Sequence, residues 1–141
     1  MDPDVRGRST LNAVELEPLT AAIAAALYPS ARVQAIGYEQ ARIPRNTQDL
    51  ILSNVPFGKF GVADPAFTGA TSFLTKRIHN YFFAKALEHA RPGGLIVFVT
   101  SRYTLDAGSE ARVRQYLTDR AHFLGAVRLP NSAFDKSAKT E

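Results

Sequence analysis

The chain has no cysteine and no tryptophan among its 141 residues. Without cysteine, disulfide bonds and thiolate metal sites are excluded. The three histidines, His79, His89 and His122, show none of the spacings typical of a zinc site, so we expect no metal. No apolar run has membrane-spanning length, and the acidic start at residues 1–4 is unlike a signal peptide. These absences predict a cytoplasmic protein that does not bind a membrane.

The composition is that of one globular domain. Hydrophobic residues make up 45% of the chain, enough for a real core. The net charge of +4 and the isoelectric point near 9.6 permit nucleic-acid binding without demonstrating it. Residues 1–10 are polar and predict an irregular lead-in, and residues 11–141 predict the domain.

The hydrophobic pattern alternates between strand and helix periods. Pro18 suits the first turn of a helix, Glu17 suits its cap, and Ser72 suits the cap of the longest helix. The run at residues 95–99 is nearly all apolar, which predicts a central strand buried on both faces. This order is typical of a parallel sheet with crossover helices. Strands are expected at 11–16, 32–36, 49–54, 95–99 and 123–130, and helices at 18–27, 72–91 and 109–119.

The strand at 49–54 stops at an unusual corner. Asn54 stands at its end, Val55 is held out of the helical region by Pro56, and Phe57 and Gly58 follow. An amide, a carbonyl and an aromatic ring would then meet at the carboxyl end of a strand, where open α/β sheets bind ligands. Alternatively, the corner is a tight turn that only closes the strand.

The string from Asn54 to Gly58 resembles the Asn-Pro-Pro-Tyr/Phe motif of adenine-specific N6 DNA methyltransferases of bacteria, plasmids and phages. Residues 79–87 and 126–134 resemble further segments of the same group. The resemblance implies a partial Rossmann-like class I methyltransferase fold, a mostly parallel sheet flanked by helices. It also implies S-adenosylmethionine as cofactor, a flipped or single-stranded adenine in DNA as substrate, and a helicase domain as a frequent neighbour.

The family's chemistry transfers to four residues. The Asn54 side-chain carbonyl and the backbone carbonyl of Val55 or Pro56 would accept hydrogen bonds from the adenine amine, and Phe57 would stack on the base. Because the base must leave the duplex stack, base flipping or a single strand is implied. Catalysis would then consist mostly of positioning the amine beside the methyl donor.

Cofactor-binding roles follow from the same resemblance. Glu15 ends the first strand, on the sheet edge that Asn54 shares, and would hold the cofactor ribose. Tyr38 would pack on the cofactor adenine. Gly37 stands where the family carries an aspartate, a departure that leaves Glu39 to reach the adenine amine from a shifted position.

Three residues are candidates for DNA contact. Lys59 and Phe60 lie in a long glycine-rich loop, and Arg102 follows the strand at 95–99. The alternative is a surface loop anchored by its phenylalanines, with a solvated arginine.

The family's Gly-x-Gly cofactor loop has no counterpart in this sequence. We therefore expect a partial domain with weak cofactor affinity of its own: a fragment of a larger protein, a gene remnant, or a sequence given without its remaining segments. Two alternatives stay open. One is a non-catalytic remnant that binds DNA or a partner domain, including the rest of the same protein. The other is methylation of an RNA or protein amide nitrogen on the same fold.

Overall fold

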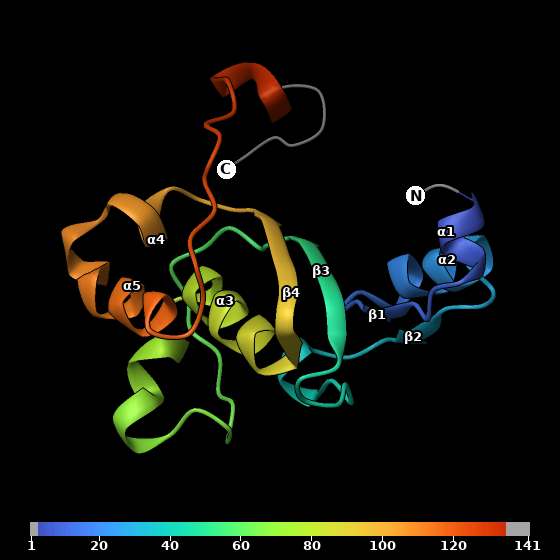
Figure 1. Ribbon diagram of the computed structural model, residues 1–141, viewed down its shortest axis with the longest axis horizontal. Helices are drawn as coiled ribbons and strands as arrows, with labels where there is room; N and C mark the ends of the chain where they lie inside the picture. The colour runs from blue at the N-terminus through green and yellow to red at the C-terminus, as the bar shows by residue number, and fades with distance from the viewer. Residues whose placement is uncertain (1–2, 135–141) are drawn as a thin grey trace.

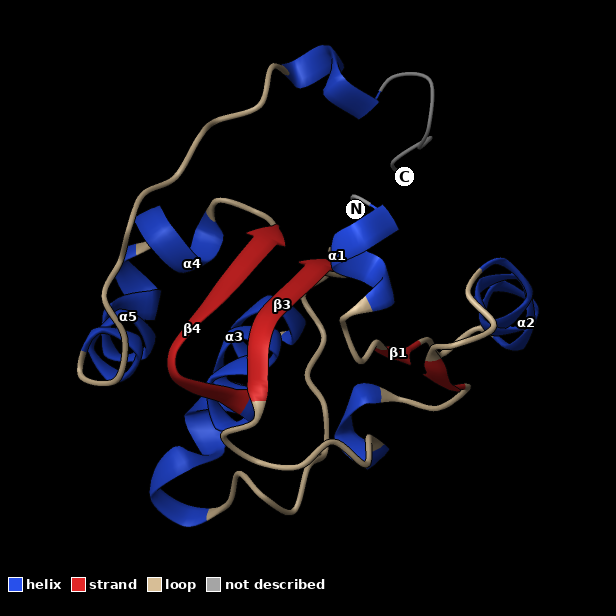
Figure 2. Ribbon diagram, turned by 45° about the vertical axis from the view of Figure 1, so that its right-hand side comes forward, coloured by secondary structure: helices blue, strands red, loops and turns tan. Residues whose placement is uncertain are grey.

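The computed structural model describes residues 3–134, in which helices pack on short parallel strands (Figures 1 and 2). The strands are β1 (Asn12–Val14), β2 (Arg32–Gln34), β3 (Gln48–Asn54) and β4 (Ala90–Val99). The helices are α1 (Pro3–Gly7), α2 (Pro18–Leu27), α3 (Ile78–His89), α4 (Tyr103–Asp106) and α5 (Ala111–Thr118). Short 3-10 turns occur at Tyr38–Gln40, Gly69–Thr75, Gly108–Glu110 and Asn131–Phe134.

The start of the chain differs from the expected irregular lead-in. Residues 3–7 form α1, so the prediction of an irregular stretch is wrong there. Residues 1–2 and 135–141 lie outside the described residues. No helix of the described chain is long and apolar enough to span a bilayer.

The strands form two separate parallel pairs, β1 with β2 and β3 with β4. This confirms a mixed α/β chain with parallel strands, but the expected single sheet is wrong for the residues described. The two pairs meet through side chains, because Asn12 Nδ2 donates a hydrogen bond to Gln48 Oε1 at 3.2 Å. Both residues stand at the start of their strands. Glu15 and Asn54 therefore end strands of different sheets.

The core is built around α3. Its buried members come from the loop after β3, the 3-10 turn Gly69–Thr75, α3 and α5. They are Phe67, Leu74, Ile78, Tyr81, Ala84 and Val113. On the sheet side, the rings of Phe83 in α3 and Phe98 in β4 lie 5.0 Å apart. The helix thus covers one face of the β3–β4 sheet (Figure 2).

The other face of the β3–β4 sheet is open to solvent. The strand register places five apolar side chains together on it, and their exposed fractions run from 38% to 62%. The prediction that the strand at 95–99 is buried on both faces is therefore wrong. No element of residues 3–134 packs against that face, which leaves one side of an apolar strand pair uncovered. The five residues, called the open face below, are Leu50, Leu52, Leu95, Val97 and Val99.

The helix α3 begins six residues later than Ser72, the predicted cap. Ser72 instead lies within the 3-10 turn, where its hydroxyl donates to the carbonyl of Gly69 at 2.9 Å. Arg77 is extended, and this lets the backbone N–H of Ile78 donate to the carbonyl of Phe60 at 2.8 Å. Tertiary contact with the loop decides where α3 starts.

Other helix predictions hold. The helix at 18–27 has the predicted bounds, and Glu17 caps it by accepting from the Thr20 N–H at 2.6 Å. That capping lowers the pKa of Glu17. The helix predicted at 109–119 is α5, with Val113 buried.

The strand predicted at 123–130 does not form. The segment lies in no strand, and its apolar side chains Phe123, Leu124 and Val127 are 64% to 87% exposed. A strand needs a partner for its N–H and C=O groups, and no described strand pairs with this segment.

Candidate functional site

The corner after β3 is fixed by one buried residue. Asn54 pairs in register with Val99 of β4, and the Val55 N–H donates to the Val99 carbonyl at 2.9 Å. Val55 is 1% exposed, whereas Asn54, Pro56 and Phe57 are exposed. The structure therefore brings the four predicted residues together at the carboxyl end of β3, with the amide and the ring accessible.

A shallow hollow of about 430 Å³ lies beside Asn54. It opens over the carboxyl halves of both strands, on the side of the open face. Its floor is apolar except for Ser53 and the Asn54 amide. The lining residues are Leu52, Ser53, Asn54, Val97, Phe98 and Val99.

The loop that follows the corner is held by a buried ionic cluster around Asp64. The Asp64 carboxylate, 6% exposed, accepts from the Tyr81 hydroxyl at 2.7 Å and from Lys85 Nζ at 2.8 Å. It also accepts from the Ala66 N–H at 2.8 Å. Burial alone would raise the pKa of Asp64, but these hydrogen bonds outweigh burial and lower it. The loop is thereby tied to α3.

Between Val55 and Asp64 the loop carries two exposed rings. Phe57 is 49% exposed and Phe60 is 56% exposed, with the exposed Lys59 between them. Gly58 has no positive φ, so its backbone conformation does not by itself require glycine. Instead, a Cβ atom at position 58 would collide with the Phe60 ring, with 2.6 Å to Cδ1. The glycine makes room for the ring.

The end of β4 carries the third candidate for DNA contact. Arg102 follows Thr100 and Ser101 and caps the short α4. Its side chain stays 70% exposed despite an ion pair of 3.6 Å with Asp106. Such an exposed pair leaves the charge available to other partners.

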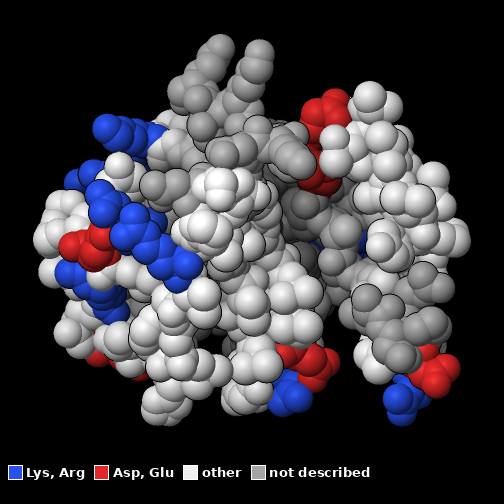
Figure 3. All heavy atoms as spheres, turned by 90° about the horizontal axis from the view of Figure 1, so that it is seen from above, with Lys and Arg blue, Asp and Glu red and all other residues white. Residues whose placement is uncertain are grey.

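Basic side chains gather at the α4–α5 end of the molecule. Figure 3 looks onto the edge where β3 and β4 end, and Lys and Arg side chains cluster on its left side. Exposed arginines of this region are Arg102, Arg112 and Arg120. Two of them stack on rings, Arg112 on Phe73 at 4.0 Å and Arg120 on Tyr116 at 3.7 Å. Stacking fixes their position without neutralising the charge.

The expected cofactor carboxylates differ in their surroundings. Glu15 follows β1, as predicted, and one of its oxygens accepts from the Glu17 N–H at 2.9 Å. Glu39 lies in the 3-10 turn after β2, with its carboxylate folded over Gly37. A Cβ atom at position 37 would lie only 2.6 Å from the Glu39 Cδ. The carboxylate of residue 39 thus occupies the space of a side chain at residue 37.

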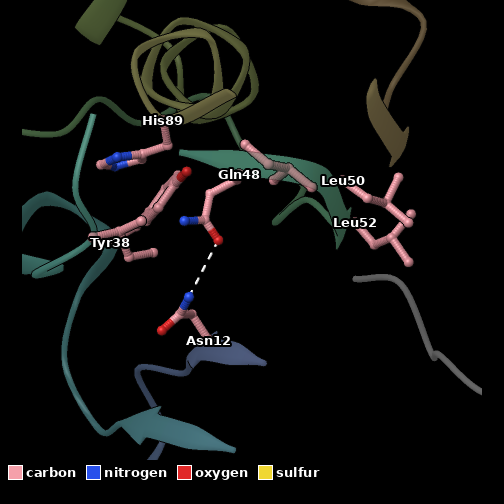
Figure 4. A pocket seen from close by; sticks show the side chains of 8 residues that line it. Asn12, Tyr38, Gln48, Leu50, Leu52 and His89 are labelled. Atoms are coloured by element: carbon pink, nitrogen blue, oxygen red, sulfur yellow. Dashed lines mark hydrogen bonds between the residues drawn. The ribbon is translucent and has the colours of Figure 1, made fainter. Parts of the chain in front are cut away.

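Tyr38 packs against α3. Its ring lies 5.0 Å from that of Phe82 and 5.8 Å from that of His89. Burial raises the pKa of Tyr38 and lowers that of His89, so both side chains are neutral at pH 7. Figure 4 shows the two rings side by side near Gln48 and Asn12, around a small cavity of about 80 Å³ at the starts of the strands. Tyr38 is therefore distant along β3 from the Asn54 corner.

A second buried polar cluster links the start of α3 to α4 and α5. Asn80 Nδ2 donates to Glu110 at 2.5 Å and its Oδ1 accepts from Thr104 at 2.9 Å, while Arg77 pairs with Glu110 at 2.9 Å. Burial lowers the pKa of the adjacent His79, which is 1% exposed. This cluster ties α4 and the start of α5, which follow β4, to the first turn of α3.

Sequence reasoning missed Asp64. One signal was present: Asp before Pro65 in a glycine-rich loop is typical of a side chain that bonds its own backbone two residues on. The spacing of Tyr81 and Lys85, four residues apart, also puts their side chains on one helix face. Nothing in the sequence indicated that Asp64 and the pair Tyr81 and Lys85 would be in contact. Within residues 3–134 no group of His, Asp and Glu side chains is arranged to hold a metal.

Two known proteins resemble this chain. The Defense against restriction protein B of Escherichia phage P1 is 28% identical over 132 residues, which is 90% of this chain and 6% of that protein. The uncharacterized protein YtxK of Bacillus subtilis strain 168 is 24% identical over 90 residues, 60% of this chain and 26% of that protein. No family model and no solved structure matches. The chain therefore spans a small part of each relative's length.

Proposed function

We propose that the chain is the base-binding part of an S-adenosylmethionine-dependent methyltransferase acting on the N6 amine of adenine in DNA. The observation that carries this proposal is the corner at Asn54 to Phe57, where an accessible amide and ring stand at the carboxyl end of a parallel strand. One relative is named for defence against restriction. Modification of DNA bases is one chemistry by which DNA is protected from restriction, so that name supports the proposal.

The residues of the corner suit an exocyclic amine. Its lone pair is delocalised into the ring, so it is a weak nucleophile. Acceptance of its two N–H bonds by the Asn54 carbonyl and by the Val55 or Pro56 carbonyl would turn the lone pair out of the ring plane. Phe57 would hold the base by stacking. When bound, S-adenosylmethionine supplies an electrophilic methyl group, and the protein's part is to orient the amine towards it.

Some of the residues proposed to bind the cofactor have suitable positions. Glu15 and Glu39 each follow a strand of the β1–β2 pair, a position suited to ribose and adenine hydrogen bonds. The carboxylate of Glu39 over Gly37 supports its role as substitute for the family's aspartate. Tyr38 offers only a partly accessible ring. Because the sequence has no Gly-x-Gly, we propose that further polypeptide completes this half.

A second candidate function is that of a non-catalytic module bound to a partner domain, such as a helicase or the rest of the same protein. The open face of β3–β4 favours it, because five large apolar side chains on one surface are typical of an interaction site. Under either proposal the chain would be located in the cytoplasm, where bacterial DNA lies. Methylation of an RNA or a protein amide fits the same corner but has no separate observation in its favour.

The proposal is tested by N6-methyladenine formation in a bacterial host that lacks this modification. The chain is expressed with its adjoining coding sequence, and genomic nucleosides are quantified by mass spectrometry. Asn54→Ala should lower methylation by about a hundredfold or more, because it removes a hydrogen-bond acceptor at the reacting group. Asn46→Gly is the control, since that exposed residue has a φ of 55° that glycine adopts freely.

Undiminished methylation in Asn54→Ala would show that the catalytic assignment is wrong. Absence of N6-methyladenine from wild-type cells, together with retained binding of a partner domain, would favour the second candidate function instead.

A further inference from the structure

The ring of Phe60 packs on the backbone of Gly58, and this packing position is called its seat below. The ring lies close enough that a Cβ atom at position 58 would require it to shift. Yet the ring is not buried, since Phe60 remains 56% exposed. A phenylalanine placed in this way covers the backbone with one side of its ring and leaves apolar surface to solvent, three residues beyond the exposed Phe57.

The backbone that carries the ring is fixed by hydrogen bonds at residues 60 and 62. The Phe60 carbonyl accepts from the Ile78 N–H at 2.8 Å, and the Val62 N–H donates to the Thr75 carbonyl at 2.9 Å. Gly61 passes so near the Thr75 carbonyl that a Cβ atom there would lie 2.5 Å from the oxygen. Surface loops are usually more mobile than the elements that they connect. This one is held by main-chain bonds to the start of α3 and the turn before it, so little conformational freedom is lost when a ligand binds.

The charge around the two rings suits a phosphate. Lys59 is exposed and is the one charged residue of residues 55–63. The nearest acidic residue along the loop, Asp64, is buried and paired with Lys85 at 2.8 Å. The open face nearby is aliphatic and lacks rings. Single-stranded nucleic-acid sites combine aromatic rings, on which bases stack, with cations that attract the phosphates. Residues 57–60 carry both kinds of group within four consecutive positions.

We infer that the arc from Phe57 to Phe60 binds two neighbouring bases of single-stranded DNA. The target base stacks on Phe57, the adjacent base stacks on Phe60, and Lys59 contacts a backbone phosphate near them. The inference depends on the proposed function only for the identity of the base on Phe57. It makes the substrate a strand opened over at least two nucleotides, in contrast to one base flipped from an intact duplex.

The test is binding of a fluorescein-labelled single-stranded oligodeoxynucleotide to the chain, followed by anisotropy. Phe60→Ala should weaken binding roughly 5- to 150-fold, the range that loss of one stacked base gives. Gly58→Ala keeps the phenylalanine but displaces its ring through the added Cβ atom, so it should also weaken binding. Phe60→Tyr should bind like the wild type. Phe123→Ala, which removes an exposed phenylalanine elsewhere, is the matched control.

A second arm follows 2-aminopurine placed beside the target adenine. Its fluorescence should be quenched by the wild type and remain unquenched with Phe60→Ala, because stacking quenches the base. Equal affinity of Phe60→Ala and Phe123→Ala would overturn the inference. So would duplex DNA that binds as tightly as the single strand. An oligoribonucleotide that binds better than the DNA would overturn the choice of DNA.

These readouts are separate from methyl transfer. Loss of single-strand binding in Phe60→Ala, combined with methylation that survives Asn54→Ala, would contradict the proposed function and leave the two-base site standing. Methylation of a single-stranded substrate that depends on Asn54 but is unchanged by Phe60→Ala would contradict the two-base site and leave the proposed function standing.

Discussion

The ionic cluster around Asp64 should govern the stability of the chain. Asp64→Ala removes the acceptor of both Tyr81 and Lys85, and leaves the Lys85 ammonium buried, with its side chain 8% exposed. Removal of one partner from a buried ion pair costs about 3–5 kcal/mol. Domains of this size are stable by roughly 5–15 kcal/mol, so the variant should be only marginally folded. With a urea slope of about 2 kcal/mol per molar, the midpoint should fall by roughly 1.5–2.5 M.

Urea unfolding at pH 7, followed by far-ultraviolet circular dichroism, measures this shift, because the chain has no tryptophan to report it. Asp49→Ala is the matched control. It breaks an exposed ion pair with Arg91 of 2.5 Å, whose side chains are 77% and 49% exposed. An exposed pair contributes less than about 1 kcal/mol. The double variant Asp64→Ala/Lys85→Met should recover part of the loss, since it leaves no unpaired ammonium. Equal midpoints for Asp64→Ala and Asp49→Ala would refute the reasoning.

The same cluster sets a pH dependence. Because the folded pKa of Asp64 is lower than the unfolded value of about 3.9, its contribution is complete above the unfolded value and is lost as the pH falls through the folded one. The difference in unfolding free energy between wild type and Asp64→Ala should be constant from about pH 5 to 8 and shrink below about pH 4. A difference that persists unchanged at pH 2.5 would contradict the assigned role of the carboxylate.

Two further variants test the loop and the sheet. Gly61→Ala should destabilise the chain by about 1–3 kcal/mol, since its Cβ would lie 2.5 Å from the Thr75 carbonyl; an unchanged thermal midpoint would contradict that contact. Leu52→Thr on the open face should change stability by less than about 0.5 kcal/mol, whereas Phe98→Ala on the covered face should cost about 2 kcal/mol or more. Equal losses in denaturant titrations of these two would contradict the one-sided packing of the sheet.

Local signals in the sequence predicted local structure well. The bounds of α2 follow from Pro18 and the Glu17 cap, both of which act within one turn. The end of β3 at Asn54 follows from Pro56 and from the polar residues after an apolar run. The buried Val55 that fixes this corner was predicted only as part of the motif, because its bond to Val99 joins residues far apart in the sequence.

Features that depend on distant contacts were not predictable in the same way. The start of α3 at Ile78 requires the Phe60 carbonyl, and the role of Asp64 requires Lys85 on another element. The apolar run at 95–99 predicts burial but cannot say whether a covering element exists, and none lies over it in residues 3–134. The segment at 123–130 has a strand pattern without a strand beside it. In each case the sequence pattern describes the segment itself, but it does not identify the distant segment that packs or pairs with it.

The seat of Phe60 on Gly58 links two positions of the sequence that are not neighbours. Any residue with a side chain at position 58 would push the ring away, and without the ring nothing requires glycine there. Related sequences should therefore vary these positions together: glycine at 58 with an aromatic at 60, or a larger residue at 58 with a small or polar one at 60. The pairing would mark which relatives accept two bases and which accept one.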